Sequence, residues 1–369
     1  MARIDSLNVL LDPSGKMLLA EAYKGVIENV QKSAISTQLK NTDLSGDPQA
    51  GTVEAKRFQN AASQSYGTAR SGGAGNAVKG KTVTIAIDTD REFVEEIEQK
   101  DISLLGVDGL IAKRSANHAQ RLTAELDSAF FAVSAYEGVA FTPSVSASTY
   151  VDKIEEAVVT LESLKTNYID GLDRSMLSVV CTPVVYSSIR KYLDTSVHNA
   201  NVDTAAEQFV RFHGVKVFSS TRLSEGIEFL VMMDGSVAQP VRSTPYAAER
   251  IPMSEAFAVE MFFYYGTKAV TPETILYYNP SLTVTSAAGT ASGDTKITVS
   301  PTKMTGHSYA YKTAASVDIP AYGTTLTGYS TWDGSADITA TTGNEIVIVE
   351  LDADSKVYKT GKATVTSAT

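Results

Sequence analysis

The sequence predicts an α+β protein in which residues 1–279 form the main body and residues 280–369 form a small all-β domain. Two observations support this division. The first part of the chain contains both apolar side chains at helical spacing and strands with a period of two residues, and the helical spacing occurs only there. After Asn279-Pro280 the composition becomes rich in Thr, Ser, Ala and Gly, and short β runs are separated by turn signals without any helical pattern. A length of 369 residues is sufficient for a main domain and a smaller one.

The composition argues against several classes of protein. The formal net charge of −10 argues against a basic groove for nucleic acid, because phosphate contacts need clustered Lys and Arg. The single cysteine, Cys181, cannot form an intrachain disulfide and lies in an apolar run, so we expect a small buried hydrophobe. The residues after Met1 show no signal-peptide pattern, and no stretch is apolar enough to span a membrane, so we expect synthesis in a reducing cytoplasm.

Residues 1–50 are predicted to form a polar arm with one amphipathic helix and little to pack on within its own domain. Residues 51–90 predict a long two-stranded arm, because Val53–Phe58 and Val83–Asp88 both have strand patterns. The Gly-rich stretch between them has almost no large apolar residue, so this arm has no core of its own. An isolated hairpin is at best marginally stable in water. We therefore expect it to lie on a neighbouring subunit, and a flexible surface loop is the alternative.

Three helices are predicted in residues 91–175 and just before them. Thr89-Asp90-Arg91-Glu92 fits a capping box that opens a helix over Phe93–Ile97. The stripe of Leu122–Val133 marks a second helix. The third has the clearest apolar stripe, runs from about Thr149 to Tyr168, and would span roughly 30 Å at 1.5 Å per residue.

The remaining elements are one helix and a series of short strands. The helix begins at Thr182-Pro183, which suits an N-cap followed by N1. In the main body the predicted strands are Met176–Cys181, Val215–Phe218, Phe229–Met233, Phe257–Tyr265, Lys268–Val270 and Ile275–Tyr278. In the C-terminal part they are Leu282–Thr285, Lys296–Val299, Ser316–Ile319, Glu345–Leu351 and Ala363–Thr366. The latter pattern is typical of a small immunoglobulin-like β-sandwich, with Trp332 as its core aromatic residue.

The order of these elements resembles the tailed-bacteriophage major capsid fold, which encapsulins share. Val53–Asp90 resembles the extended loop of that family, Thr149–Tyr168 its spine helix, Met176–Tyr192 with Phe212–Val217 and Phe229–Asp234 its axial domain, and Phe257–Tyr265 with Gly266–Val270 its return strands. The resemblance implies an N-terminal arm at 1–50, an extended loop at 51–90, a peripheral domain with the spine helix at 91–175, an axial domain at 176–250, return strands of the peripheral domain at 251–279 and an immunoglobulin-like sandwich at 280–369.

The resemblance also implies a function. A major capsid protein would assemble into hexamers and pentamers of an icosahedral phage shell that encloses double-stranded DNA without sequence-specific binding. It would act with a separate scaffold protein and a portal, would not use a membrane, and would become part of the virion after assembly in the host cytoplasm. The alternatives are an encapsulin-like nanocompartment shell, a tail-tube protein or an adhesin.

The predicted subunit interface rests on charge complementarity. The candidate residues in the extended loop are Arg57, Tyr66, Arg70, Lys79 and Lys81, and the candidate acceptors on the helix of 149–168 are Glu155, Glu156 and Glu162. Some members of the family crosslink through a loop Lys and a peripheral-domain Asn. The corresponding positions here are Lys79 or Lys81 and Asn279, and whether subunits crosslink stays open.

No catalytic constellation emerges from the sequence, so we predict a protein that is not an enzyme and has no cofactor or metal site. His118, His198, His213 and His307 show no metal-binding spacing and are expected to be solvated. Gly72–Gly75 resembles a nucleotide loop only superficially, because no helix opens after it to present N–H groups to a phosphate.

Overall fold

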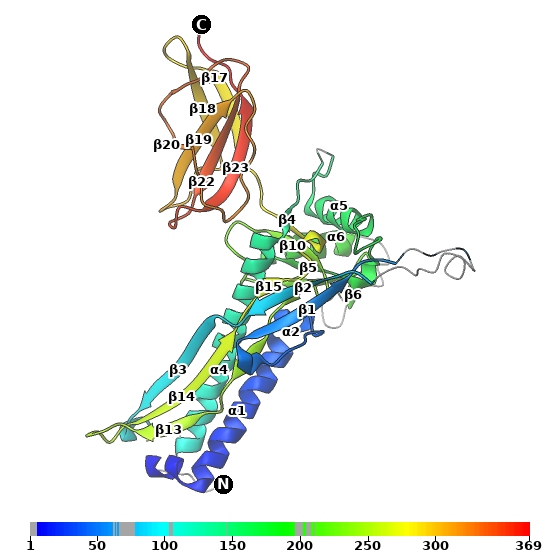
Figure 1. The fold of residues 1–369 in the computed structure, drawn as a ribbon. Coiled ribbons are helices and arrows are strands. Elements are labelled where there is room, and N and C mark those ends of the chain that lie inside the picture. Colours follow the sequence, from blue (N-terminus) through cyan, green and yellow to red (C-terminus); the bar gives the residue numbers. More distant parts are fainter. Residues whose placement is uncertain are drawn as a thin grey trace.

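The computed structural model describes residues 6–61, 63, 65, 78–102, 106–144, 146–195, 202–203, 208–209 and 211–369. These residues form three bodies arranged in a row, and a β-hairpin projects sideways from them (Figure 1). None of the described helices is long and apolar enough to cross a membrane.

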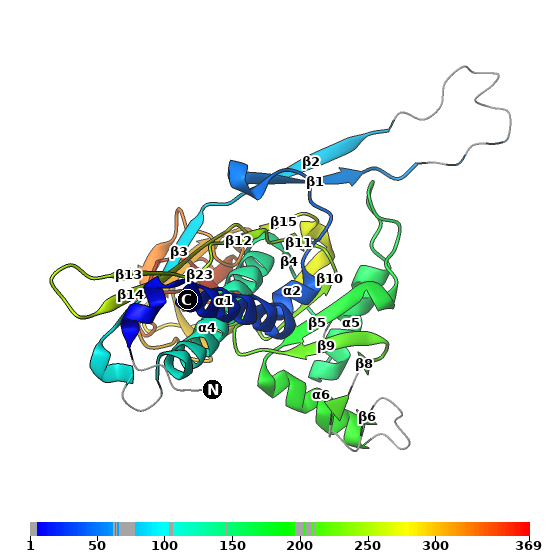
Figure 2. The same cartoon turned by 90° about the horizontal axis from the view of Figure 1, so that it is seen from below.

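The first part, which we call the long body, consists of two helices that lie side by side against one face of a sheet (Figures 1 and 2). Its elements are η1 (Leu7–Leu11), α1 (Pro13–Ser33), β3 (Thr89–Ile97), η3 (Gln99–Ile102), α4 (Gly106–Glu137), β12 (Val241–Ser243), β13 (Ala247–Arg250) and β14 (Phe257–Tyr265). β14 pairs with β3 along one edge and with β12 and β13 along the other. Alternate residues of β14 are buried, as predicted, and they face α1 and α4.

Two predictions for this part of the chain are wrong. Residues 89–97 form strand β3 and not a helix, because the whole segment pairs with β14 from Thr89 opposite Tyr265 to Ile97 opposite Phe257. Non-local pairing therefore overrides the local capping signal. The N-terminal arm also has a partner within its own chain, since Leu19 and Val26 of α1 are buried against α4.

The second part, which we call the central body, is a three-layer structure built on a six-stranded sheet in the order β4-β16-β10-β5-β9-β8. Its strands are β4 (Val139–Ala140), β5 (Leu177–Cys181), β8 (Arg211–Phe212), β9 (Val215–Ser219), β10 (Phe229–Met233) and β16 (Ile275–Tyr278). Its helices are α2 (Ile35–Leu39), α5 (Tyr150–Glu162) and α6 (Pro183–Thr195), with η4 (Arg174–Met176) and η5 (Pro272–Thr274). Two small pairs complete it, β6 (Val202–Asp203) with β7 (Gln208–Phe209) and β11 (Val237–Ala238) with β15 (Lys268–Ala269).

The two faces of this sheet are covered by different helices. Val179 and Cys181 of β5 belong to the cluster shared with α5 and α6, whereas Val180 belongs to the cluster shared with α2 and the end of α4. Burial raises the pKa of the Cys181 thiol to about 12, in agreement with a small buried hydrophobe. A strand buried on both faces explains its continuous apolar sequence.

The predicted spine helix is wrong in both length and place. The helix at this position, α5, ends at Glu162, although Thr149 and Asp152 do form the predicted N-terminal cap as a capping box. It packs in the central body with α6 and β5. The long helix of the chain is α4, with 32 residues that span about 48 Å. Its first half is buried in the long body, and Phe130, Phe131 and Ala135 are buried in the central body.

The third part, which we call the sandwich, confirms the predicted C-terminal β-sandwich. A sheet of β17 (Thr283–Ala288), β18 (Asp294–Ser300) and β21 (Ile338–Thr339) faces a sheet of β20 (Ser330–Trp332), β19 (Ser308–Ala314), β22 (Glu345–Leu351) and β23 (Val357–Thr364). Trp332 is buried in its core, as predicted. The predicted strand at 316–319 is wrong. Val317 is buried there, but its N–H donates to the Glu345 side chain and not to the backbone of a paired strand. Strands β19, β20 and β21 were not predicted, and the strand predicted at 363–366 is the end of β23, which begins at Val357.

The projecting hairpin is formed by β1 (Thr52–Phe58) and β2 (Gly80–Ala86), after η2 (Pro48–Ala50). Its base has a core: Val53, Ala55 and Ile85 are buried with Ala238 and Val270 of the central body. The prediction of an arm without a core is therefore wrong for the base, and most of the Gly-rich stretch lies outside the described residues. Gly266 allows the base of the hairpin to pack this closely on the body, because a Cβ at this position would lie 1.7 Å from the carbonyl oxygen of Ala86.

We expect Gly266→Ala to lower the free energy of unfolding by about 1–3 kcal/mol, because the methyl group must displace the base of the hairpin. Chemical denaturation followed by circular dichroism measures this change. Gly25→Ala in α1 is the matched control, since its Cβ would meet nothing within 4 Å. It is expected to raise the stability by up to about 1 kcal/mol. Equal changes in stability for the two variants would contradict the close packing of Gly266 against the base of the hairpin.

Candidate functional site

The hairpin leaves the body as an antiparallel ladder, from Thr52 opposite Ala86 to Phe58 opposite Gly80. Figure 2 shows that it points away from all three bodies. Towards its outer end the apolar side chains become exposed, with Phe58 at 59% and Val78 at 84% of their full accessible area. Exposed aromatic and branched side chains on a thin ladder favour a role in contact with another molecule.

Arg57, predicted as an interface residue, instead anchors the hairpin to its own chain. Its guanidinium forms an ion pair with Glu273 and lies 4.4 Å from the ring centroid of Tyr168, and its side chain is only 10% exposed. The N–H of Asn60 also donates to the carbonyl of Asn167 at 2.9 Å. These contacts attach β1 to the central body, and the Arg57 side chain is occupied by partners within its own chain.

The other predicted loop residues divide into two groups. Lys79 and Lys81 are exposed, and Lys56 on the paired strand is exposed as well. Tyr66 and Arg70 lie outside the described residues. Lys56 and Phe58 lie on one face of the ladder, whereas Lys81, opposite Arg57, lies on the other face, so the outer stem as a whole carries both positive charge and apolar surface.

The three predicted acceptors on α5 are also engaged within the chain. Glu155 and Glu162 both pair with Arg174, and Glu155 also lies 2.8 Å from Nδ1 of His213. Glu156 accepts hydrogen bonds from the N–H and hydroxyl of Ser144. Because these carboxylates stabilise the loops that follow and precede α5, they are poor candidates for a partner's lysines.

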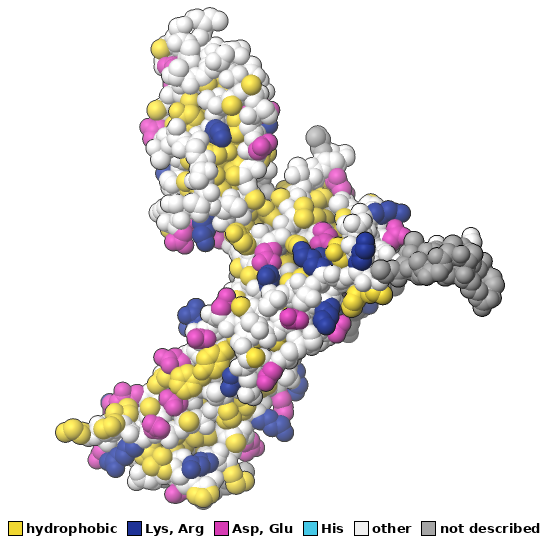
Figure 3. Space-filling view, viewed as in Figure 1, with side chains coloured by type: hydrophobic (Ala, Val, Ile, Leu, Met, Phe, Trp, Pro, Cys, Tyr) yellow, Lys and Arg dark blue, Asp and Glu magenta, His cyan; other side chains and the backbone are white. Residues whose placement is uncertain are grey.

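A different acidic surface is available on the long body, on the side of the β3–β14 sheet that faces away from the helices. We call it the acidic face. Its residues are Asp90, Glu92, Val94 and Glu96 of β3, Glu249 of β13, Glu260, Phe262 and Tyr264 of β14, and one cation, Arg242 of β12, opposite Tyr264. Figure 3 shows hydrophobic side chains bordered by acidic ones over these strands.

The register of the strands mixes the two kinds of side chain on the acidic face. Val94 lies opposite Glu260, and Phe262 lies opposite Glu92. Val94 is 50% exposed, and the acidic residues of β3 are exposed too. The sequence contained the signal for this surface, namely the alternation along 90–97, but the capping-box pattern favoured a helix and the strand was missed.

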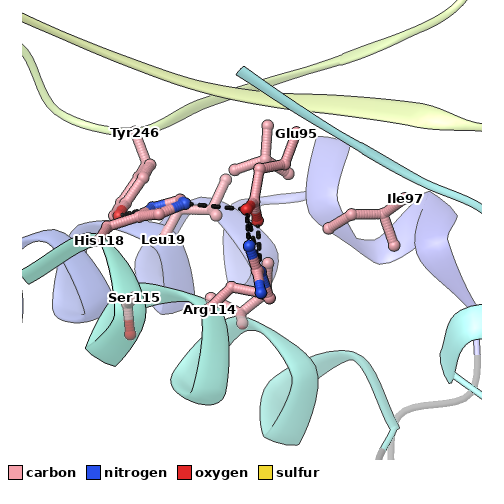
Figure 4. Close-up of a pocket in the computed structure, with 9 residues that line it drawn as sticks. Leu19, Glu95, Ile97, Arg114, Ser115, His118 and Tyr246 are labelled. Atoms are coloured by element: carbon pink, nitrogen blue, oxygen red, sulfur yellow. Dashed lines mark hydrogen bonds and ion pairs between the residues drawn. The ribbon is translucent and has the colours of Figure 1, made fainter. Parts of the chain in front are cut away.

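The prediction that the histidines are solvated is wrong for His118 and His307. His118 is 3% exposed, and its Nδ1 lies 2.6 Å from the Tyr246 hydroxyl (Figure 4). His307 is largely covered, with 9% of its side chain exposed, and its Nδ1 lies 2.8 Å from the Glu350 carboxylate. His213 is partly exposed, and His198 lies outside the described residues.

The His118 cluster connects three elements of the long body. Nε2 of His118 lies 3.2 Å from Glu95 of β3, and Glu95 accepts a hydrogen bond from Nε of Arg114 at 2.8 Å (Figure 4). The hydrogen bond from Arg114 lowers the pKa of Glu95 against the opposing effect of burial. The cavity beside these groups measures about 10 Å³, roughly the room for one water molecule, so the arrangement is suited to holding α4 against β3.

Among the residues that the structure describes, no group of three or more His, Cys, Asp or Glu side chains is placed to hold a metal ion.

Comparisons with known proteins found one family model and a set of similar solved structures. Residues 287–368 match the family described as S-layer protein SbsC C-terminal domain. No curated protein matches the sequence. Similar solved structures include one from Mycobacterium phage Che8 (17% identity, TM-score 0.47, 62% of this chain and 84% of that chain). Another is the capsid of Cyanophage P-SCSP1u (14% identity, TM-score 0.47, 67% and 88%). A third is a virus-like particle from Pyrococcus furiosus (9% identity, TM-score 0.45, 70% and 98%).

We expect Glu95→Gln to lower the free energy of unfolding at pH 7 by about 1–2 kcal/mol, because a charge-assisted hydrogen bond is lost. The lowered pKa of Glu95 means that its stabilisation is fully present above the ordinary value of 4.5 and is lost as the pH falls through the lower folded value. The difference between variant and wild type should therefore shrink below pH 4.5. Denaturation at a series of pH values measures it, with Glu96→Gln on the exposed face as the control. A constant difference at all pH values would contradict this assignment.

Proposed function

We propose that this protein is a shell-forming structural protein, the major capsid protein of a tailed bacteriophage. The observation that carries the proposal is the hairpin. Its base is packed on the central body and Arg57 and Asn60 attach one side of β1 to that body, but Phe58, Val78 and three lysines of its outer stem remain exposed. A two-stranded ladder of this kind gains stability when a neighbouring surface buries it. A second copy of the chain is the partner we propose.

The acidic face is the surface that we propose receives the hairpin of the neighbouring copy. Lys79 and Lys81 are positive and exposed, while Glu92 and Glu96 are negative and exposed. Val94 and Phe262 provide apolar area between the carboxylates, which suits Phe58 and Val78 of the incoming stem. Complementary charge sets the register and speeds the encounter, whereas apolar burial supplies most of the affinity.

A contact in which one copy's hairpin meets a different surface of the next copy is head-to-tail, so it generates rings when the rotation closes. We propose that such rings are the hexamers and pentamers of an icosahedral shell. Each contact can be weak, because every subunit makes several of them. The net charge of −10 fits a wall that encloses double-stranded DNA without binding it tightly.

The proposed role is structural and not enzymatic, and the proposed setting is the virion after assembly in the host cytoplasm. A separate scaffold protein and a portal are the further partners that we propose for assembly.

We expect the double variant Lys79→Glu/Lys81→Glu to abolish shell formation, because it places carboxylates against the acidic face. Adding Glu92→Lys/Glu96→Lys should restore particles by reversing both sides of the contact. Sedimentation velocity and negative-stain electron microscopy of the expressed chain, alone and with its assembly partners, measure the outcome.

Lys296→Glu/Lys356→Glu is the matched control for this experiment. It makes the same change of charge on the sandwich, where both lysines are exposed, and it should leave assembly intact. Normal particles from the hairpin variant would contradict the proposed contact. A wild-type chain that stays monomeric at high concentration with or without its partners would contradict the shell itself.

A further inference from the structure

The sandwich is joined to the central body by a very short connection. β16 ends at Tyr278 and β17 begins at Thr283. Within this connection, the side-chain amide of Asn279 donates to the carbonyl of Tyr358 at 2.5 Å, and the N–H of Leu282 donates to the carbonyl of Thr360 at 2.8 Å. Both acceptors lie on β23, so the connecting residues are held against the sandwich and have little freedom to act as a hinge.

A tyrosine from the sandwich reaches back into the central body. Tyr322, from the loop between β19 and β20, packs on the cluster that contains Phe130 and Ile275. Its ring centroid lies 6.0 Å from that of Tyr277, and its hydroxyl donates to the carbonyl of Glu225 at 3.3 Å. Burial raises the pKa of Tyr322. This side chain therefore bridges the sandwich and the central body at a point away from the covalent connection.

Two glycines allow the bodies to approach closely at this contact. A Cβ at Gly323 would lie 2.9 Å from the ring of Tyr136 at the end of α4, and a Cβ at Gly226 would lie 3.0 Å from the ring of Tyr358. Both glycines have positive φ angles, +73° and +84°, which side-chain-bearing residues rarely adopt. At each glycine a methyl group would have to displace a tyrosine ring of the other body.

The sandwich side of the contact has an internal support. The ring of Tyr358, which touches Gly226, packs edge-on against His307 at 4.6 Å. His307 lies 2.8 Å from the carboxylate of Glu350, which is 1% exposed and also accepts the N–H of Met304 at 2.9 Å. A buried, hydrogen-bonded group of this kind has few alternative arrangements, so Tyr358 presents a stiff surface to the body.

We propose that these contacts hold the sandwich in one fixed orientation on the central body, so that the chain presents it as a rigid arm and not as a module on a flexible tether. Tyr322 is the positioning residue of this joint. The inference does not depend on the proposed shell, because every contact lies within one chain.

Distance measurements between spin labels test the proposal. Lys296→Cys on the sandwich and Lys191→Cys on α6 are exposed labelling positions, while Cys181 is buried. Labelled chains are diluted into unlabelled chains so that only distances within one chain are recorded by double electron–electron resonance. We expect one narrow distance distribution for the full chain, and a distribution at least twice as wide for Tyr322→Ala. Tyr329→Ala is the matched control, since its hydroxyl bonds to Asp318 within the sandwich.

A second variant separates the joint from the short connection. Four Gly-Ser residues inserted between Pro280 and Ser281 lengthen the connection and leave Tyr322, Gly323 and Gly226 unchanged. The distribution should stay narrow if the joint holds the sandwich. A broad distribution for the uninserted wild-type chain, a broad distribution on insertion alone, or a narrow one for folded Tyr322→Ala would each overturn the proposal.

Discussion

The burial of α4 along its whole length is the constraint on which the other elements depend. Its first half closes the core of the long body against α1 and β14, and its last turns bring Phe130 and Phe131 under the sheet of the central body. Because one continuous helix belongs to two hydrophobic cores, the two bodies cannot rotate freely about each other. The sandwich is then seated at the end of the same helix, where Tyr136 meets Gly323.

The hairpin is the main element that this shared core does not cover. Its base is buried with Val270 and Ala238, and Arg57 fixes its direction through Glu273 and Tyr168. The body therefore fixes the direction of the hairpin through a few contacts on one side, while Phe58 and Val78 stay exposed. A hairpin with a base packed on its own chain and exposed side chains on its stem can contact a neighbouring subunit in one orientation. The acidic face offers a complementary surface on the same chain.

Helices and strands whose apolar side chains recur at a regular spacing could be predicted from the sequence. The alternation of Phe257–Tyr265, the paired strands around the Gly-rich stretch and the sandwich with Trp332 follow from apolar spacing, and the structure contains all of them. Interactions between segments distant in the sequence were not predictable. Residues 89–97 carry a helix-capping signal, but nine residues of β14 offer them a complete ladder, and backbone pairing outweighs a weak local preference. The candidate acceptors on α5 were chosen by charge, whereas Arg174 already neutralises two of them.

The sequence by itself determined the strands and helices with a clear apolar period, such as Phe257–Tyr265, and the change of composition after Asn279. Only the tertiary structure decided which helix is the spine, which charges are free and how the sandwich is seated. The physical reason is that periodicity indicates whether a residue is buried, but it does not indicate which other residues it packs against. The partners of Arg57, His118 and Tyr322 lie more than 20 residues away in the chain, so their roles emerge only when distant segments meet.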